Sequence, residues 1–121
     1  MKNPTRAELQ SALFLTWSKE TSADPEGWTN ENPAWGQCAV TTLIVQDYFE
    51  GEILRASLEA VTGFERMRSH YWNRLETGER DFSQSQFPAD IYKTIPKGEM
   101  RTREYLLSNP DTAQRYRVLK T

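Results

Sequence analysis

The feature that most constrains this chain is the long apolar segment at residues 37–49, QCAVTTLIVQDYF, which is followed by Gly51. Val40, Leu43 and Ile44 recur within it at helical spacing. Its β-branched residues leave a strand possible, but its length and the glycine that follows it favour a buried helix. The rest of the chain is therefore expected to pack around this helix.

The segments before this helix predict a second helix and an ordered loop. Thr5 and Glu8 have the spacing of a capping box, and Leu13 lies on the apolar face of the helix expected over about residues 6–19. Residues 21–36 are rich in turn formers but contain two tryptophans. Because a disordered loop rarely carries such apolar area, we expect this loop to lie over the core and Trp28 to serve as a lid.

After Gly51 the pattern changes to short apolar runs and alternation, which indicates strands. We expect strands at residues 53–61, 67–75, 80–82 and 89–95, with a tight turn at residues 77–78, and helices near residues 101–107 and 110–119. With 121 residues, the chain is expected to form a single domain over residues 1–121. The predicted fold is α+β: an antiparallel sheet of three or four strands packs on a central Cys-bearing helix, with N- and C-terminal helices.

Composition excludes several classes of function. A net charge of -2 argues against binding to nucleic acid, and no apolar run approaches the roughly 20 residues that span a bilayer. One cysteine cannot form an internal disulfide, and together with one histidine it falls short of a structural zinc site. We therefore expect a cytoplasmic protein with no metal and no cofactor, acting on an unidentified small-molecule, peptide or acyl substrate. The sequence leaves its oligomeric state open.

Cys38 and His70 are the residues best suited to chemistry. Cys38 stands at the predicted start of the central helix, where free backbone N–H groups and the helix dipole favour a thiolate. His70 lies in a predicted strand, where it could act on a thiol. The alternatives are structural, since free cysteines are usually buried and a lone histidine beside aromatic residues is usually packed in the core.

Three stretches of the chain resemble the YunG family of small bacterial proteins: NPAWGQCAVTTLIVQDYFEGEIL, HYWNRLETGERDFSQSQF and REYLLSNPDTAQRYRVL. The resemblance runs from about residue 32 to the C-terminus. The family brings no established activity with it. What the resemblance implies is a set of polar signature positions: Gln37, Cys38, His70, Asn73, Asp81 and Gln86.

A wider analogy is with papain-like and transglutaminase-like enzymes, which place a cysteine at a helix start and a histidine and an acid or amide on successive antiparallel strands. By that analogy Cys38 is the nucleophile, His70 the base, Asp81 or Asn73 the group that orients it, and Gln37 a donor to an oxyanion. The leading function is then a thiol-dependent hydrolase or acyl transferase. The alternatives are a binding module that keeps the cleft without the chemistry, and a protein-interaction adaptor.

One consideration opposes Asp81 as the partner of His70. With a two-residue turn at residues 77–78, Asp81 lies opposite Arg74, and His70 lies four residues out of register, about 13 Å away. Either the register is shifted, or Asp81 caps the turn formed by residues 82–87 and another group orients His70. Asn73 is the weaker candidate, because it points to the opposite face of a regular strand.

The remaining site candidates are aromatic or amide residues. Trp35 and Trp72 could form walls of a cleft beside Cys38 and His70, although ordinary core packing explains them as well. Gln86 and Asn73 complete the set of substrate-binding candidates.

Overall fold

The computed structural model describes residues 4–120, except for the side chain of Arg66. The helices are α1 (Arg6–Thr16), α2 (Cys38–Phe49), α3 (Arg103–Leu107) and α4 (Pro110–Lys120). The strands are β1 (Glu52–Ser57), β2 (Ser69–Leu75), β3 (Gly78–Arg80) and β4 (Glu99–Arg101). Four short 3₁₀ helices complete the elements: η1 (Lys19–Thr21), η2 (Glu65–Met67), η3 (Gln84–Gln86) and η4 (Ala89–Lys93).

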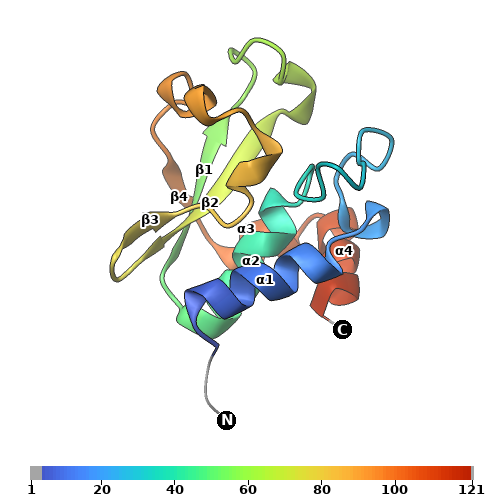
Figure 1. Cartoon of the computed structure of the whole chain (residues 1–121). Coiled ribbons are helices and arrows are strands. Elements are labelled where there is room, and N and C mark those ends of the chain that lie inside the picture. The colour runs from blue at the N-terminus through green and yellow to red at the C-terminus, as the bar shows by residue number, and fades with distance from the viewer. Residues whose placement is uncertain (1–3, 121) are drawn as a thin grey trace.

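The strands form one antiparallel sheet in the order β3-β2-β1-β4, so the predicted α+β class is confirmed. In Figure 1 the sheet lies on one side of α2 and α4 lies on the other, and α1 crosses in front of α2. None of the helices within residues 4–120 is long and apolar enough to cross a membrane.

Helix α2 is the centre of the main hydrophobic core. Val40, Leu43 and Val45 are completely buried, which confirms the prediction of a buried helix. Thr41 and Thr42 are buried as well, and Thr41 accepts a hydrogen bond of 3.0 Å from the indole of Trp17. Further side chains of this core come from helices, strands and the turn after β3: Leu9, Leu13, Ile53, Leu75, Phe82, Leu106, Tyr116 and Leu119.

The N-terminal helix follows its sequence signals. The Thr5 hydroxyl accepts from the Glu8 backbone N–H at 3.1 Å, and the Glu8 carboxylate accepts from the Thr5 backbone N–H at 2.8 Å, which is the predicted capping box. The helix ends at Thr16, three residues earlier than expected, because Trp17 adopts a non-helical conformation and turns into the core.

The fourth strand was predicted in the wrong place. Residues 89–93 form the 3₁₀ helix η4, whose turns are closed by hydrogen bonds from Ile91 N–H to the Pro88 carbonyl and from Thr94 N–H to the Ile91 carbonyl. The strand that completes the sheet is β4, which pairs with the free edge of β1. Its three mostly exposed residues carry no pattern that marks a strand, and the predicted helix at residues 101–107 begins only at Arg103.

The first strand is also shorter than predicted, because β1 ends at Ser57. The next residues fold into a turn in which the Val61 N–H donates to the Leu58 carbonyl. Leu58 and Val61 are both buried, in a second cluster with Phe87 and Ile91. Their apolar character therefore reflects this cluster and not a continued strand.

Two leucines of α1 test how much the helix contributes to the core. Leu13 is 3% exposed and Leu15 is 86% exposed. We expect Leu13→Ala to lower the free energy of unfolding by about 2–5 kcal/mol, because it leaves a cavity beneath α1. Leu15→Ala, the matched control, should change it by less than about 0.5 kcal/mol. Urea denaturation measures both, and equal effects would show that α1 is peripheral.

Candidate active site

Cys38 is the first residue of α2 and is 7% exposed. The chain enters the helix through Gly36, whose φ of +73° lies in the left-handed region that favours glycine. A Cβ atom at this position would lie 2.3 Å from the Ser22 hydroxyl oxygen. The sulfur is therefore held at the N-terminus of α2, where the first N–H groups have no intrahelical acceptor.

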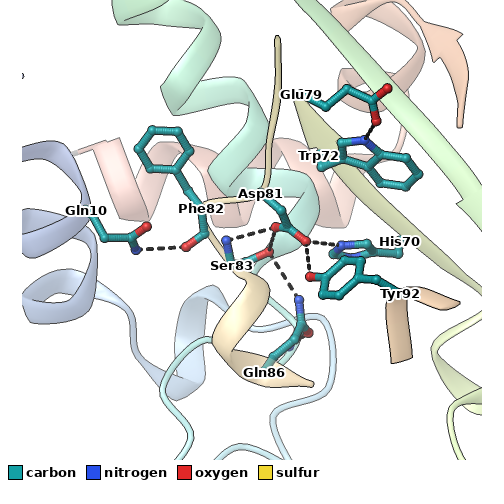
Figure 2. A network of polar contacts seen from close by, with 10 residues as sticks. Gln10, His70, Trp72, Glu79, Asp81, Phe82, Ser83, Gln86 and Tyr92 are labelled. Atoms are coloured by element: carbon teal, nitrogen blue, oxygen red, sulfur yellow. Dashed lines mark hydrogen bonds and ion pairs between the residues drawn. The ribbon is translucent and has the colours of Figure 1, made fainter. Parts of the chain in front are cut away.

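His70 is completely buried on β2 and bonds to Asp81. The distance between His70 Nε2 and Asp81 Oδ2 is 2.6 Å (Figure 2). The Trp72 ring lies nearly parallel to the imidazole at 5.5 Å, and the Phe87 ring meets it edge-on at 4.9 Å. Trp72 is itself fixed by a hydrogen bond of 2.7 Å from its indole N–H to Glu79.

A shift in strand register brings Asp81 to His70. β2 and β3 pair Leu75 with Gly78 and Asn73 with Arg80, so the turn lies at residues 76–77, one residue earlier than predicted. In this register Asp81 would face Trp72, only two residues from His70. The ladder ends at Arg80, and the chain then bends toward His70. The predicted separation of four residues was wrong because the turn was misplaced.

Asp81 fills both of the roles that the sequence analysis had treated as alternatives. Its Oδ2 atom accepts from His70 and from the Tyr92 hydroxyl, the latter at 2.5 Å (Figure 2). Its Oδ1 atom accepts from the backbone N–H and the hydroxyl of Ser83, both at 3.0 Å. One carboxylate therefore orients the imidazole and also caps the turn that follows β3.

The charges of this cluster support an ion pair. Burial by itself lowers the pKa of His70, but hydrogen bonds and charges from Asp81 and Cys38 outweigh it and raise this pKa from 6.5 to about 10. Burial raises the pKa of Asp81, but its contacts with His70, Tyr92 and Ser83 hold it below the usual 3.8. Burial and the Asp81 charge raise the pKa of Tyr92. At neutral pH the pair is therefore imidazolium and carboxylate.

The second ring nitrogen of His70, Nδ1, is buried and has no hydrogen-bond partner among the described residues. The Cys38 thiol is nevertheless close enough to contribute to raising the pKa of His70. The two observations agree if the thiol lies beside the imidazole but its distance or angle does not meet that of a hydrogen bond. Such loose contacts are common in active sites without substrate.

Gln86 links Asp81 to the loop that precedes Cys38. Its amide N–H donates to the Ser83 hydroxyl at 3.2 Å, and its amide oxygen accepts from the Gly36 backbone N–H at 3.1 Å. Gln86 was predicted to bind substrate. In this structure its amide joins the loop before Cys38 to the turn that holds Asp81.

Two further amide candidates are also engaged within the protein. Gln37 donates to the Ser18 carbonyl at 2.9 Å and accepts from the Thr21 hydroxyl at 2.7 Å, so it joins η1 to α2. Asn73 donates to the Thr42 carbonyl at 3.1 Å. Neither side chain orients His70.

The tryptophans of the loop before α2 are anchored by their indole N–H groups. Trp35 donates to Asp24 at 3.0 Å, and Trp28 donates to the Pro33 carbonyl at 2.9 Å. Both contacts are internal to the loop. The loop is ordered, as predicted, and Trp35 also packs near Phe64.

Sequence reasoning missed Tyr92 and Ser83. Ser83 had a signal, because an aspartate followed two residues later by a serine is typical of a turn in which the carboxylate accepts the N–H two residues on. Tyr92 had none, since it lies in a segment predicted as a strand. No group of three or more histidine, cysteine, aspartate or glutamate side chains within residues 4–120 is arranged to hold a metal ion.

The fold and site together define a small α+β protein in which a cysteine begins the central helix and a buried His–Asp pair lies beside it. The family model described as YunG protein matches residues 5–121, and the chain belongs to the YunG family. It is similar to the uncharacterized protein YunG of Bacillus subtilis (strain 168), with 33% identity over 106 residues, covering 87% of this chain and 82% of that protein. No solved structure matches it.

The pKa of His70 can be measured directly, because the chain has one histidine. We expect its imidazole NMR signals to remain those of imidazolium through pH 8. In Asp81→Asn the partner charge is lost and burial dominates, so the midpoint should fall to 6.5 or below. A wild-type midpoint near 6.5 would contradict the ion pair.

The same ion pair predicts how stability depends on pH. A pKa raised on folding contributes stability that is complete below the unfolded value of 6.5 and is lost as the pH rises through about 10. The lowered pKa of Asp81 contributes stability above 3.8 that is lost as the pH falls. Urea denaturation of the wild type should therefore show a decline above about pH 6.5 that is absent in Asp81→Asn.

Gly36 and Gly63 test the backbone that places Cys38. Both have a positive φ, but a Cβ atom at Gly63 meets nothing within 4 Å. Gly63→Ala should cost about 1–2 kcal/mol for its conformation alone. Gly36→Ala should cost more, because its Cβ atom also collides with Ser22 and with the backbone of Ala23. Equal losses in urea denaturation would show that the loop before α2 adapts easily.

Proposed function

We propose that this protein is a thiol-dependent hydrolase or acyl transferase in which Cys38 is the nucleophile, His70 the acid and base, and Asp81 the residue that orients His70. The observation that carries the proposal is the buried His70–Asp81 pair, 2.6 Å apart, with the other imidazole nitrogen free of any described partner beside the Cys38 thiol. Nucleophilic acyl transfer requires a nucleophile, a base beside it and a third group that orients the base.

The reaction starts from the state in which the proton of the Cys38 thiol has moved to His70, so that Cys38 is a thiolate. The thiolate attacks the acyl carbon of an amide, ester or thioester, and an S–C bond forms. The bond to the leaving group then breaks, and His70 gives the leaving group its proton. Water, or the amine or hydroxyl of an acceptor, attacks the resulting thioester while His70 takes up a proton, and the cysteine sulfur is released.

Backbone N–H groups of the first turn of α2 are the donors best suited to the oxyanion of this reaction. The backbone N–H of Cys38 is one of these donors, because N–H groups in the first turn of a helix have no intrahelical acceptor. Gln37 already donates to the Ser18 carbonyl, which leaves one amide hydrogen for the role first suggested for it.

The order of the elements supports the analogy with papain-like and transglutaminase-like enzymes. The cysteine begins a helix, the histidine follows on β2, and the aspartate lies just after the neighbouring antiparallel strand β3. The analogy drawn from the sequence requires this same order of cysteine, histidine and acid.

A second candidate is a binding module without catalysis. It is favoured by the burial of both reactive groups, since Cys38 is 7% and His70 0% exposed. A substrate has to reach the sulfur for the enzyme proposal to hold, whereas a binding module makes no such demand.

Alkylation by iodoacetamide separates the two proposals, because Cys38 is the single cysteine of the chain. If His70 holds the proton of the thiol, the native protein should react at pH 6 at a rate not far below that at pH 8. The urea-unfolded chain is the reference, and its rate should fall about tenfold per pH unit in this range, as for ordinary thiols.

Two variants assign the effect. His70→Gln and Asp81→Asn should each move the profile toward that of the unfolded chain, and circular dichroism should confirm that they are folded. Glu52→Gln, which removes a carboxylate that pairs with the exposed Arg74, should leave the profile unchanged. A native protein that resists alkylation up to pH 9 and reacts only when unfolded would remove the enzyme proposal and favour the binding module.

A further inference from the structure

Tyr92, in the 3₁₀ helix η4, shares one oxygen atom of Asp81 with His70. Its hydroxyl donates to Asp81 Oδ2 at 2.5 Å, and His70 Nε2 bonds to the same atom at 2.6 Å (Figure 2). A hydrogen bond to a carboxylate stabilises the negative charge and so lowers its affinity for protons. The Tyr92 hydroxyl therefore acts on the atom through which Asp81 holds the imidazole.

The place of the Asp81 carboxylate does not depend on Tyr92. Its other oxygen, Oδ1, accepts hydrogen bonds of 3.0 Å from the backbone N–H and from the hydroxyl of Ser83. These two bonds, together with the one to His70, fix the carboxylate in the turn after β3. What the Tyr92 hydroxyl adds is therefore stabilisation of the charge on Oδ2.

The ring of Tyr92 is held by packing as well as by its hydroxyl. It meets the imidazole of His70 at 6.4 Å and the ring of Phe87 at 6.5 Å, both in edge-on geometry. Ile91, the preceding residue, is buried in one apolar cluster with Phe87 and anchors η4 there. Tyr92→Phe is thus expected to keep the ring in place and to remove the hydroxyl alone.

We propose that Tyr92 is a positioning residue of the site, which acts on His70 through Asp81 by limiting how strongly the shared oxygen stabilises the imidazolium. In acyl transfer His70 has to give a proton to the leaving group, and an imidazolium that its partner holds too firmly is a poor acid. The Tyr92 hydroxyl draws on the same oxygen and so keeps this hold in check. The inference rests on the proposed role of His70 as acid and base.

The direction of the effect distinguishes this role from a merely structural one. In Tyr92→Phe the Asp81 charge is less stabilised, so the carboxylate holds both its own proton and the imidazolium more firmly. The pKa of Asp81 and the pKa of His70 should then both rise. If the hydroxyl only kept Asp81 in place, its loss would weaken the pair, and burial would lower the pKa of His70.

Other titratable groups near Tyr92 are the same in wild type and variant. Burial and the Asp81 charge are the main causes of the raised pKa of Tyr92, and Cys38 of α2 adds to it. A hollow of about 340 Å³ beside Asp81 and Tyr92 has charged side chains in its lining, and η4 carries two more: Glu79, Arg80, Lys97, Asp90 and Lys93. A difference between wild type and Tyr92→Phe therefore comes from the hydroxyl.

NMR of the single histidine, labelled with ¹⁵N, measures the effect directly. At pH 7 the Nε2–H signal of His70 should lie further downfield in Tyr92→Phe than in wild type, because its hydrogen bond to Asp81 is stronger. The acid dissociation constant of His70 should be about threefold or more lower in the variant. Circular dichroism at each pH checks that the protein is folded, and Tyr92→Leu, which also lacks the hydroxyl, replaces a Tyr92→Phe protein that is not.

The matched control is Tyr105→Phe, which removes a hydroxyl from a tyrosine of α3 that is 48% exposed, against 40% for Tyr92. It should leave both His70 readouts unchanged. An unchanged or a lower His70 midpoint in Tyr92→Phe would overturn the inference.

The same comparison in Cys38→Ala separates this inference from the proposed function. The Tyr92 effect should persist there, because it passes through Asp81 and not through the thiol, and its loss would overturn the inference. A thiol that resists alkylation would remove the enzyme proposal, but the NMR readouts of His70 do not depend on a reactive thiol.

Discussion

The buried pair of His70 and Asp81 is the interaction on which the rest of the site depends. Burying two charges is expensive, and their attraction offsets the cost only when the geometry is good and the remaining hydrogen-bonding capacity is satisfied. Asp81 meets this condition, because each of its two carboxylate oxygens accepts two hydrogen bonds. His70 meets it on one side only, since its Nδ1 atom has no described partner. That open position is where the chemistry of the thiol is expected.

The same pair also ties together segments that are distant in the chain. From Asp81 the hydrogen bonds run through Ser83 to Gln86, and from Gln86 to the backbone of Gly36, two residues before Cys38. Tyr92 adds η4 to this set. The positions of Cys38 and of the His70–Asp81 pair are therefore coupled, and a change in the turn after β3 is expected to alter the start of α2.

Local signals predicted much of the scaffold. The capping box at Thr5 and Glu8 and the apolar spacing of α2 report interactions within a few residues, so they are visible in the sequence. The strands near His70 were predicted for the same reason. β4 was not, because three mostly exposed residues form a strand only where a neighbouring edge offers backbone hydrogen bonds. η4 was mistaken for a strand because its apolar residues serve a cluster with Phe87 and Leu58, which no short-range pattern reveals.

The sequence by itself determined the α+β class and the central helix that begins at the single cysteine, because helical and strand periodicity carry this information. It also marked Cys38 and His70 as the candidates for chemistry, because residue type alone identifies them. Only the tertiary structure decided that Asp81 is the partner of His70, that Gln37, Gln86 and Asn73 are engaged within the protein, and that Tyr92 joins the site. A one-residue displacement of the turn between β2 and β3 changes which residues face each other by two positions. The sequence marks a turn near Thr77 and Gly78 but not which two residues occupy it, so the register is known only from the paired strands.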